Sequence, residues 1–154
     1  MIQSYIEQPV LLASNTAPIN FTTDCIRSKG ANCNCGGWLQ HMEGSPIYKI
    51  LEGGLYEVTF NANVTSATAG PVALALFMDG VIVPGTTVIE TVVTPGDYSN
   101  VAFTKKIKIC CRGDASLSIQ SVPSVLTGTT LPGTATDTVV PIIQNANLSL
   151  KRIA

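Results

Sequence analysis

The stretch GLYEVTFNANV, residues 54–64, decides the fold class of this chain. Apolar side chains occupy every second position from Tyr56 to Val64, and polar side chains occupy the positions between them. A period of two is typical of a β-strand that has one face in a core and the other toward polar surroundings. The stretch therefore predicts a long, half-buried strand.

Similar short blocks follow this strand along the chain. Residues 71–78 are apolar on both faces, which predicts a strand that is covered on both sides. Asp79-Gly80 favours a tight hairpin turn, because both positions tolerate positive φ. More strands are predicted over residues 11–21, 81–83, 88–93, 101–110, 115–122 and 145–153, whereas the Thr- and Gly-rich residues 127–137 predict a loop or an edge strand. We therefore expect an all-β sandwich or jelly roll.

Composition limits the size and the partners of the fold. The 154 residues fit one domain, and charged residues make up 12% of them, about half of the ~25% usual in soluble domains. So little charge favours a buried surface between subunits, although Thr, Ser and Asn can also cover a monomer. The net charge is −1, and the short cluster Lys105, Lys106 and Lys108 is typical of a solvated strand face. We expect no nucleic-acid partner.

The N-terminal residues and the lengths of the apolar runs indicate where the protein is made. Residues 1–5 lack the basic and apolar regions of a signal peptide. No run of about 20 apolar residues is present, so no membrane insertion is expected. These features predict a protein that is made in a cytoplasm.

Five cysteines, Cys25, Cys33, Cys35, Cys110 and Cys111, stand in and near an irregular Gly-rich segment and at one strand end. Four interpretations remain open: buried free thiols, a disulfide between loop and strand, a zinc site and a redox centre. The spacing disfavours a standard zinc site, because adjacent cysteines in a strand point to opposite faces. We therefore predict no metal ion, and free thiols are the preferred interpretation.

No catalytic arrangement can be recognised. His41 is the sole histidine, and a lone histidine is more often structural. The carboxylates lie mostly at turns, where Asp hydrogen-bonds its own backbone, and Gly36-Gly37 lacks the lysine of a phosphate loop. Residues 112–114 read Arg-Gly-Asp, which is better explained as a turn than as a receptor motif. We predict that the protein is not an enzyme and needs no cofactor.

Three segments together resemble a known superfamily. Residues 53–60, with Gly54 and Tyr56 at their centre, are similar to a strand signature of the tumour-necrosis-factor and complement globular-head superfamily. Residues 72–86, with Asp79-Gly80 and then Pro84-Gly85, resemble its bacterial and phage branch, which includes the C-terminal domains of collagen-like spore-surface proteins. Residues 146–153 are similar to the final strand of those domains.

The resemblance implies a jelly roll of about 8–10 antiparallel strands that packs as a compact homotrimer. Residues 45–154 would form the jelly-roll core. Residues 1–44 would add an N-terminal strand and the Cys- and Gly-rich segment, an anchor or attachment within the same domain. The resemblance also gives candidates for the trimer axis or the core: Tyr56, Phe60, Phe77 and Phe103.

A stand-alone domain of this kind fits a structural virion protein, such as a trimeric capsid decoration or head-fibre protein of a bacteriophage. It would be made in the host cytoplasm, would lie on the virion surface and would contact capsid or other virion proteins. The alternatives are a trimeric module that binds a receptor or glycan, and an assembly protein of a spore or cell surface.

Overall fold

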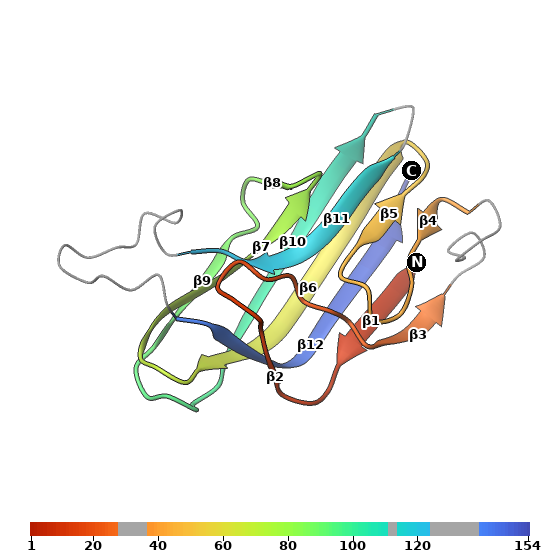
Figure 1. Ribbon diagram of the computed structural model, residues 1–154. Helices are drawn as coiled ribbons and strands as arrows, with labels where there is room; N and C mark the ends of the chain where they lie inside the picture. The colour runs from red at the N-terminus through yellow and green to blue at the C-terminus, as the bar shows by residue number, and fades with distance from the viewer. Residues whose placement is uncertain (28–36, 111–113, 124–138) are drawn as a thin grey trace.

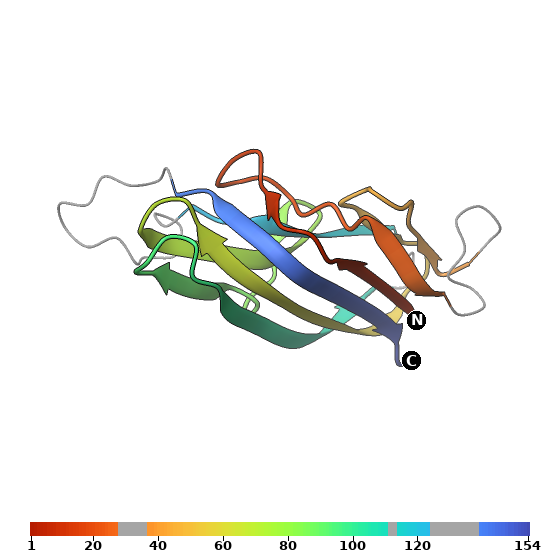
Figure 2. The ribbon, with the colours of Figure 1, turned by 90° about the horizontal axis from the view of Figure 1, so that it is seen from below.

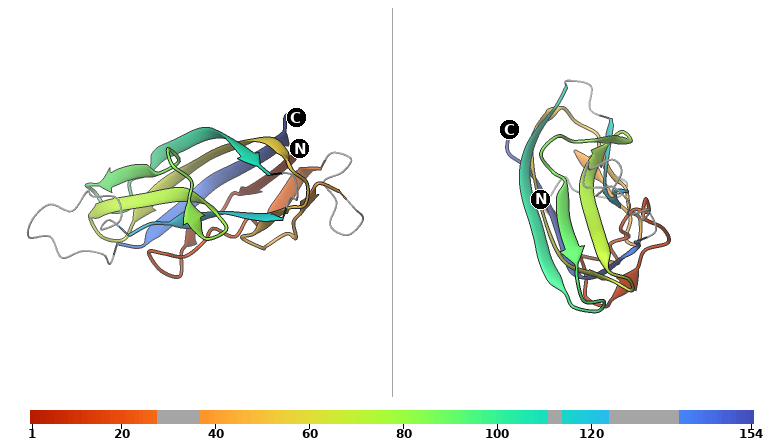
Figure 3. Two further views of the ribbon diagram at one scale, coloured as in Figure 1. Left: turned by 90° about the horizontal axis from the view of Figure 1, so that it is seen from above. Right: turned by 90° about the vertical axis from the view of Figure 1, so that its left-hand side faces the viewer.

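The computed structural model describes residues 1–27, 37–110, 114–123 and 139–154, and these residues contain β-strands and no helix. The strands form two antiparallel sheets of six strands each. The two sheets face each other as two layers (Figure 3). Among the described residues, no helix is long and apolar enough to cross a bilayer.

One sheet, called sheet A, has the strand order β10-β6-β12-β1-β3, with β2 paired to β12. The longest strands of the molecule, β6, β10 and β12, lie side by side in it (Figure 1). The bounds of its strands are β1 Ile2–Ile6, β2 Val10–Leu11, β3 Thr23–Arg27, β6 Gly54–Ser66, β10 Ser99–Ile109 and β12 Pro141–Arg152.

The other sheet, called sheet B, has the order β4-β5-β11-β7-β8, with β9 paired to β7. Its strands are β4 Leu39–Gln40, β5 Tyr48–Ile50, β7 Gly70–Met78, β8 Val81–Ile82, β9 Val88–Val92 and β11 Ala115–Ser121. The chain passes from β6 in sheet A to β7 in sheet B, and from β9 back to β10 in sheet A. Such exchange between two antiparallel sheets is the jelly-roll pattern, so the predicted fold class is confirmed.

The core lies between the two sheets, and β6 contributes most clearly to it. Tyr56, Val58, Phe60, Ala62 and Val64 are each at most 1% exposed. Their spacing of two puts Glu57, Thr59, Asn61 and Asn63 on the opposite face, toward the outside of sheet A. The half-buried strand expected from residues 54–64 is confirmed.

Strand β7 is buried on both faces, as its sequence predicted. Leu74 and Leu76 belong to the core between the sheets, whereas Ala73 and Ala75 pack with Val122 on the outside of sheet B. Strands β7 and β8 are joined by Asp79 and Gly80, whose φ angles are 51° and 80°. These angles are those of a two-residue hairpin turn of the expected kind.

The N-terminal region differs from the expectation that residues 11–21 supply one strand. Only Val10–Leu11 form a strand there, and Pro18 makes an isolated bridge to Gln120. Prolines at positions 9 and 18 explain the interruption, because proline cannot donate to a ladder. Strand β1, which the sequence analysis did not predict, lies between β12 and β3.

The two ends of the described chain lie at the same end of the sandwich (Figures 1 and 2), because Ile2 pairs with Leu150. The last residues then run along the start of β6, where Ala154 accepts a backbone hydrogen bond from Leu55 at 2.7 Å. A Cβ atom at Gly54 would lie 2.5 Å from the Ala154 carbonyl oxygen. The glycine of the signature strand is therefore required by the approach of another backbone segment.

Candidate functional site

The predicted cysteine cluster is only partly described. Cys110 has an exposed, free thiol at the end of β10, and Cys25 lies in strand β3. Cys33, Cys35 and Cys111 lie outside the described residues. Among the described residues, no group of three or more His, Cys, Asp and Glu side chains is arranged to hold a metal ion. The four interpretations of the cysteines stay predictions.

The Arg-Gly-Asp sequence falls mostly outside the described part of the chain, because Arg112 and Gly113 are not described. Asp114 has a φ angle of 69° and an ion pair with Lys49, whose nitrogen lies 3.1 Å from its carboxylate. A positive φ is uncommon for a residue with a side chain, and aspartate is one of the residues that adopt it most readily.

The four aromatic candidates divide between the core and the outside of sheet B. Tyr56 and Phe60 are fully buried between the sheets. Phe103 is half-buried and packs on Phe60, with 5.5 Å between ring centroids. Phe77 is half-buried on the outside of sheet B, against the apolar cluster of Ala73 and Ala75. Whether any of them approaches a trimer axis stays a prediction.

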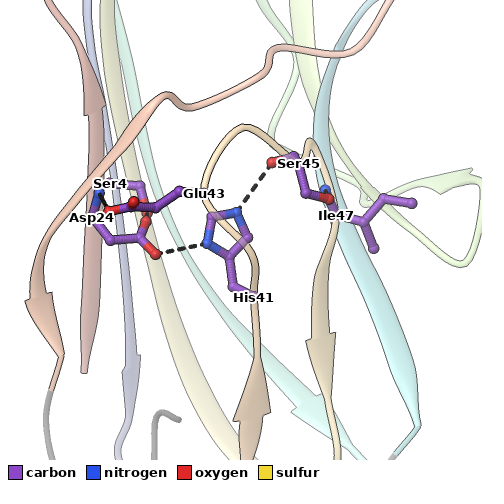
Figure 4. A network of polar contacts seen from close by, with 6 residues as sticks. All are labelled: Ser4, Asp24, His41, Glu43, Ser45 and Ile47. Atoms are coloured by element: carbon purple, nitrogen blue, oxygen red, sulfur yellow. Dashed lines mark hydrogen bonds and ion pairs between the residues drawn. The ribbon is translucent and has the colours of Figure 1, made fainter. Parts of the chain in front are cut away.

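A polar network around His41 lies between the edges of the two sheets (Figure 4). The Nδ1 atom of His41 lies 3.0 Å from a carboxylate oxygen of Asp24, and the side chains of both residues are 0% exposed. The Ser4 hydroxyl donates to the other carboxylate oxygen of Asp24. The Nε2 atom of His41 lies 3.1 Å from the carbonyl oxygen of Ser45.

The network contains Ser, His and Asp, but its order is not that of a catalytic triad. Both Ser4 and His41 contact the carboxylate of Asp24, and the second ring nitrogen of His41 faces a backbone carbonyl. A nucleophilic serine needs its hydroxyl against the histidine and open to substrate, whereas the Ser4 residue is fully buried. The arrangement is suited to holding two sheets together and not to acyl transfer.

The outer face of sheet A carries mainly uncharged polar side chains, which we call the polar face; the exposed Ala102 interrupts it beside Asn61. Cross-strand register arranges it in three rows. The first row contains Thr104, Thr59, Ser149 and Gln3; the second contains Asn61, Asn147, Tyr5 and Thr23; the third contains Asn100, Asn63 and Gln144.

Neighbours on the polar face hydrogen-bond to one another across strands. The hydroxyls of Thr59 and Thr104 lie 3.2 Å apart, and the Asn100 amide donates to the Asn63 side-chain oxygen at 3.1 Å. The Gln3 amide donates to Asn147 at 3.2 Å. Such cross-strand pairs order the side chains of a sheet face.

Among the described residues, charged side chains lie on this face only beside its first row. In the row next to the first one, Glu57 is the register partner of Lys106 on β10 and of Lys151 on β12. The alternation of sign along this row favours close packing, because opposite charges stabilise cross-strand neighbours.

A shallow groove of about 280 Å³ adjoins the polar face where β1 ends. Its lining combines one aromatic ring with carboxylate, amide and hydroxyl groups, from Tyr5, Ile6, Glu7, Gln8, Val10, Thr22 and Thr23. A second hollow, of about 490 Å³, is lined by Gly53, Gly54, Lys108, Ile109 and Cys110.

The hydroxyl of Tyr56 is placed at the same end as this second hollow. It donates to the carbonyl oxygen of Glu52 at 2.6 Å, while Arg152 forms an ion pair with the Glu52 carboxylate. Burial raises the pKa of Tyr56 above its ordinary value; the charge of Arg152 opposes this rise and that of Glu52 adds to it. The phenol is therefore kept in its neutral, hydrogen-bonded form.

The strand order and the exchange between sheets define a two-layered jelly roll. Solved structures with this fold include the globular domain of zebrafish complement 1qA protein, with a TM-score of 0.59 and 10% identity, covering 99% of this chain and 96% of that one. The Eiger TNF of S. frugiperda is also similar, with a TM-score of 0.55 and 8% identity, covering 100% and 92%. No protein-family model and no curated protein matches the sequence.

Sequence reasoning did not find the His41 network or the polar face. The network joins His41 to Asp24, 17 residues before it, and through Asp24 to Ser4, 37 residues before it, on strands that were not predicted to pair. The polar face had a visible signal, because Asn, Gln, Thr and Ser fill the outward positions of three predicted strands. What the sequence lacked was the register that brings these positions into rows.

Proposed function

We propose that this chain is a non-enzymatic structural protein that assembles as a homotrimer through the polar face of sheet A, and that it serves on a bacteriophage virion as a capsid decoration or head fibre. The polar face is the observation that carries the proposal. Its three rows carry no charge, although exposed strand faces are where soluble proteins usually place lysine and glutamate.

The chemistry of the polar face suits contact with a second copy of the same chain. Amide and hydroxyl side chains can each donate and accept, so one copy can hydrogen-bond to another without a complementary charge. Their desolvation costs less than that of ions, which is why charged residues are depleted from interface cores.

The outer face of sheet B is less suited to the same role. Its centre is already occupied, because Ala73, Ala75 and Val122 are each at most 4% exposed within one chain. Lys49 is exposed on the same face of β5. We therefore place the contact between copies on sheet A.

The contact is tested by one substitution on each sheet. Asn61→Arg adds a charge to the centre of the polar face, whereas Thr91→Arg adds the same charge to an exposed strand position of sheet B. We expect wild type and Thr91→Arg to sediment as trimers at micromolar concentration and Asn61→Arg to sediment as a monomer. A monomeric wild type would refute the trimer, and a trimeric Asn61→Arg would refute the proposed face.

The virion role rests on the resemblance and needs its own test. Immunogold labelling of purified phage particles from the source of the chain should place the protein on capsids, and its gene should neighbour capsid genes. Labelling of spores or cell surfaces instead would favour the spore or cell-surface assembly alternative and would overturn the virion role without affecting the trimer.

The groove beside Tyr5 favours a second candidate function, the recognition of a glycan. Sugars stack on aromatic rings and hydrogen-bond to carboxylate and amide groups, and the groove offers Tyr5 with Glu7 and Gln8. A glycan array with wild type and Tyr5→Ala tests it. Binding that disappears in Tyr5→Ala would support this function, and an array without signal would remove it.

A further inference from the structure

One end of the outer face of sheet A carries a group of lysines, which we call the cationic end: Lys106, Lys108 and Lys151. Lys106 on β10 and Lys151 on β12 flank Glu57 on β6 as its register partners. Lys108 lies two residues further along β10 on the same face, and its register partner is the apolar Leu55. This part of the face therefore holds three ammonium groups and one carboxylate.

The lysines of the cationic end are exposed, whereas Glu57 is half-buried. Within the described residues, the ion pairs of lysine and arginine side chains belong to Lys49 and Arg152, and none includes a member of the cationic end. Lys105 lies on the opposite face of β10, where its Nζ atom would be 3.4 Å from a Cβ atom at Gly85. Positive charge therefore gathers on one face, although the whole chain has a net charge of −1.

The proposed trimer, on which this inference rests, brings three copies of the cationic end together. A rotation about a three-fold axis keeps each atom at the same height along that axis. Lys106, Glu57 and Lys151 form the row next to the first row of the polar face, so a contact through this face puts the cationic ends of all copies at the same end of the trimer. Like charges that face one another oppose association. An anion bound among them would remove this repulsion.

We propose that the cationic end binds a small multivalent oxyanion, of the phosphate type, between the copies and that this anion stabilises the trimer. Lysine ammonium groups bind phosphate oxygens as point charges and need no fixed two-pronged geometry. Space is available beside one of them, because Lys108 also lines the hollow of about 490 Å³ together with Gly53 and Gly54.

A long polyanion such as nucleic acid fits this surface less well. The lysines are confined to one end of the face, the Glu57 carboxylate lies among them, and the rows of the polar face beside them offer no further cation. A nucleic-acid surface needs basic residues along the whole path of the phosphate backbone. A compact anion can instead contact lysines of several copies at once.

Sedimentation of wild type at low ionic strength gives the first test, with pyrophosphate as the probe and sodium chloride at matched ionic strength as the reference. An anion that binds only the trimer stabilises it about 100-fold when present at about a hundred times its dissociation constant. The protein concentration at which half of the trimers dissociate varies as the square root of the dissociation constant, so it should fall by about tenfold.

The two possible failures are distinguishable. Equal dissociation in the two salts would overturn the anion site and leave the trimer intact. A wild type that stays monomeric in both salts would overturn the trimer and the site together.

Lysine variants give the second test. The combined variant Lys106→Gln, Lys108→Gln and Lys151→Gln removes the charge of the cationic end, and Lys49→Gln on sheet B is the matched control, because it removes an exposed lysine elsewhere. Exposed substitutions of this kind leave the fold intact. In chloride, the combined variant should dissociate at a lower concentration than wild type, because the repulsion is gone, and pyrophosphate should have no further effect on it.

Lys49→Gln should keep the wild-type response to pyrophosphate. A combined variant that still responds as wild type does would show that the anion acts through general exclusion from the protein surface, and the site would be refuted. Easier dissociation of the combined variant in chloride would mean that the lysines themselves hold the copies together, which would also contradict the proposal.

Discussion

Polar side chains occupy two contrasting regions of this jelly roll, its interior edges and the outer face of sheet A. In the interior, Asp24, His41 and Thr86 are closed off from water, and each makes several short contacts. On the polar face, Thr59 and its neighbours make single cross-strand hydrogen bonds beside solvent. The residue types overlap, yet the consequences of losing a partner differ, because only the buried groups have no water to replace it.

The two regions should serve different purposes: the buried polar groups stabilise the fold, and the polar face serves the proposed association of copies. Buried polar groups hold neighbouring strands and loops together, and their substitution should lower the free energy of unfolding. Polar groups on the outer face of sheet A should contribute little to the fold, and the proposed trimer uses them to bind a second copy. Substitutions in the two regions should therefore differ in their effect on stability, with the largest loss at Asp24.

Removing Asp24 should be the most damaging change. Asp24→Ala removes the buried carboxylate that contacts both Ser4 and His41, and losing one member of a buried pair costs about 3–5 kcal/mol. Urea unfolding of the variant gives the value. Ser149→Ala on the polar face is the control and should change stability by less than about 0.5 kcal/mol.

A double-variant cycle checks that the loss comes from the pair. Asp24→Ala combined with His41→Ala removes both members of the contact, so the double variant should be less destabilised than the sum of the single variants. Additive losses would mean that the two residues act separately. The loss at Asp24 could then not be explained by the missing partner of a buried group.

Thr86 provides a neutral version of the same contrast. It is fully buried; its hydroxyl donates to the Val83 carbonyl at 2.7 Å and accepts from the Leu76 backbone N–H at 3.1 Å. Thr86→Val keeps the shape but leaves the Leu76 N–H without an acceptor, which costs about 1–3 kcal/mol. Thermal unfolding measures the loss, and an unchanged melting temperature would show that the hydroxyl is dispensable.

Tyr56 adds a pH-dependent test. Tyr56→Phe removes the hydrogen bond to Glu52 and should cost about 1 kcal/mol near neutral pH. Because burial raises the pKa of Tyr56 in the folded chain, wild-type stability should fall as the pH rises above about 10, where tyrosines of the unfolded chain ionise. Unfolding curves at increasing alkalinity should therefore converge for the two proteins, and parallel curves would contradict the pKa direction.

The same division explains how much the sequence predicted. Strands β6, β7 and β11 and the Asp79-Gly80 turn were recognised, because alternation and turn chemistry are local signals. The family resemblance added the jelly-roll topology. Strands β4 and β5 have only two and three residues, which is too short for a period of two to be visible. The His41 network was missed because its partners come together only when the two sheets pack.

The smallest expected effect lies on the polar face, at the hydroxyl pair of Thr59 and Thr104. Thr59→Ala removes a hydrogen bond that water can replace, so the unfolding free energy of the dissociated chain should change by less than about 0.5 kcal/mol. Measured in the Asn61→Arg variant, which should be monomeric, this change in unfolding free energy contains no contribution from association.

In the proposed trimer, the same substitution should weaken the contact between copies. Sedimentation at decreasing concentration should then show dissociation at a higher concentration than for wild type. A large loss in the monomeric background would mean that the polar face stabilises the fold itself, and the contrast with the buried groups would fail.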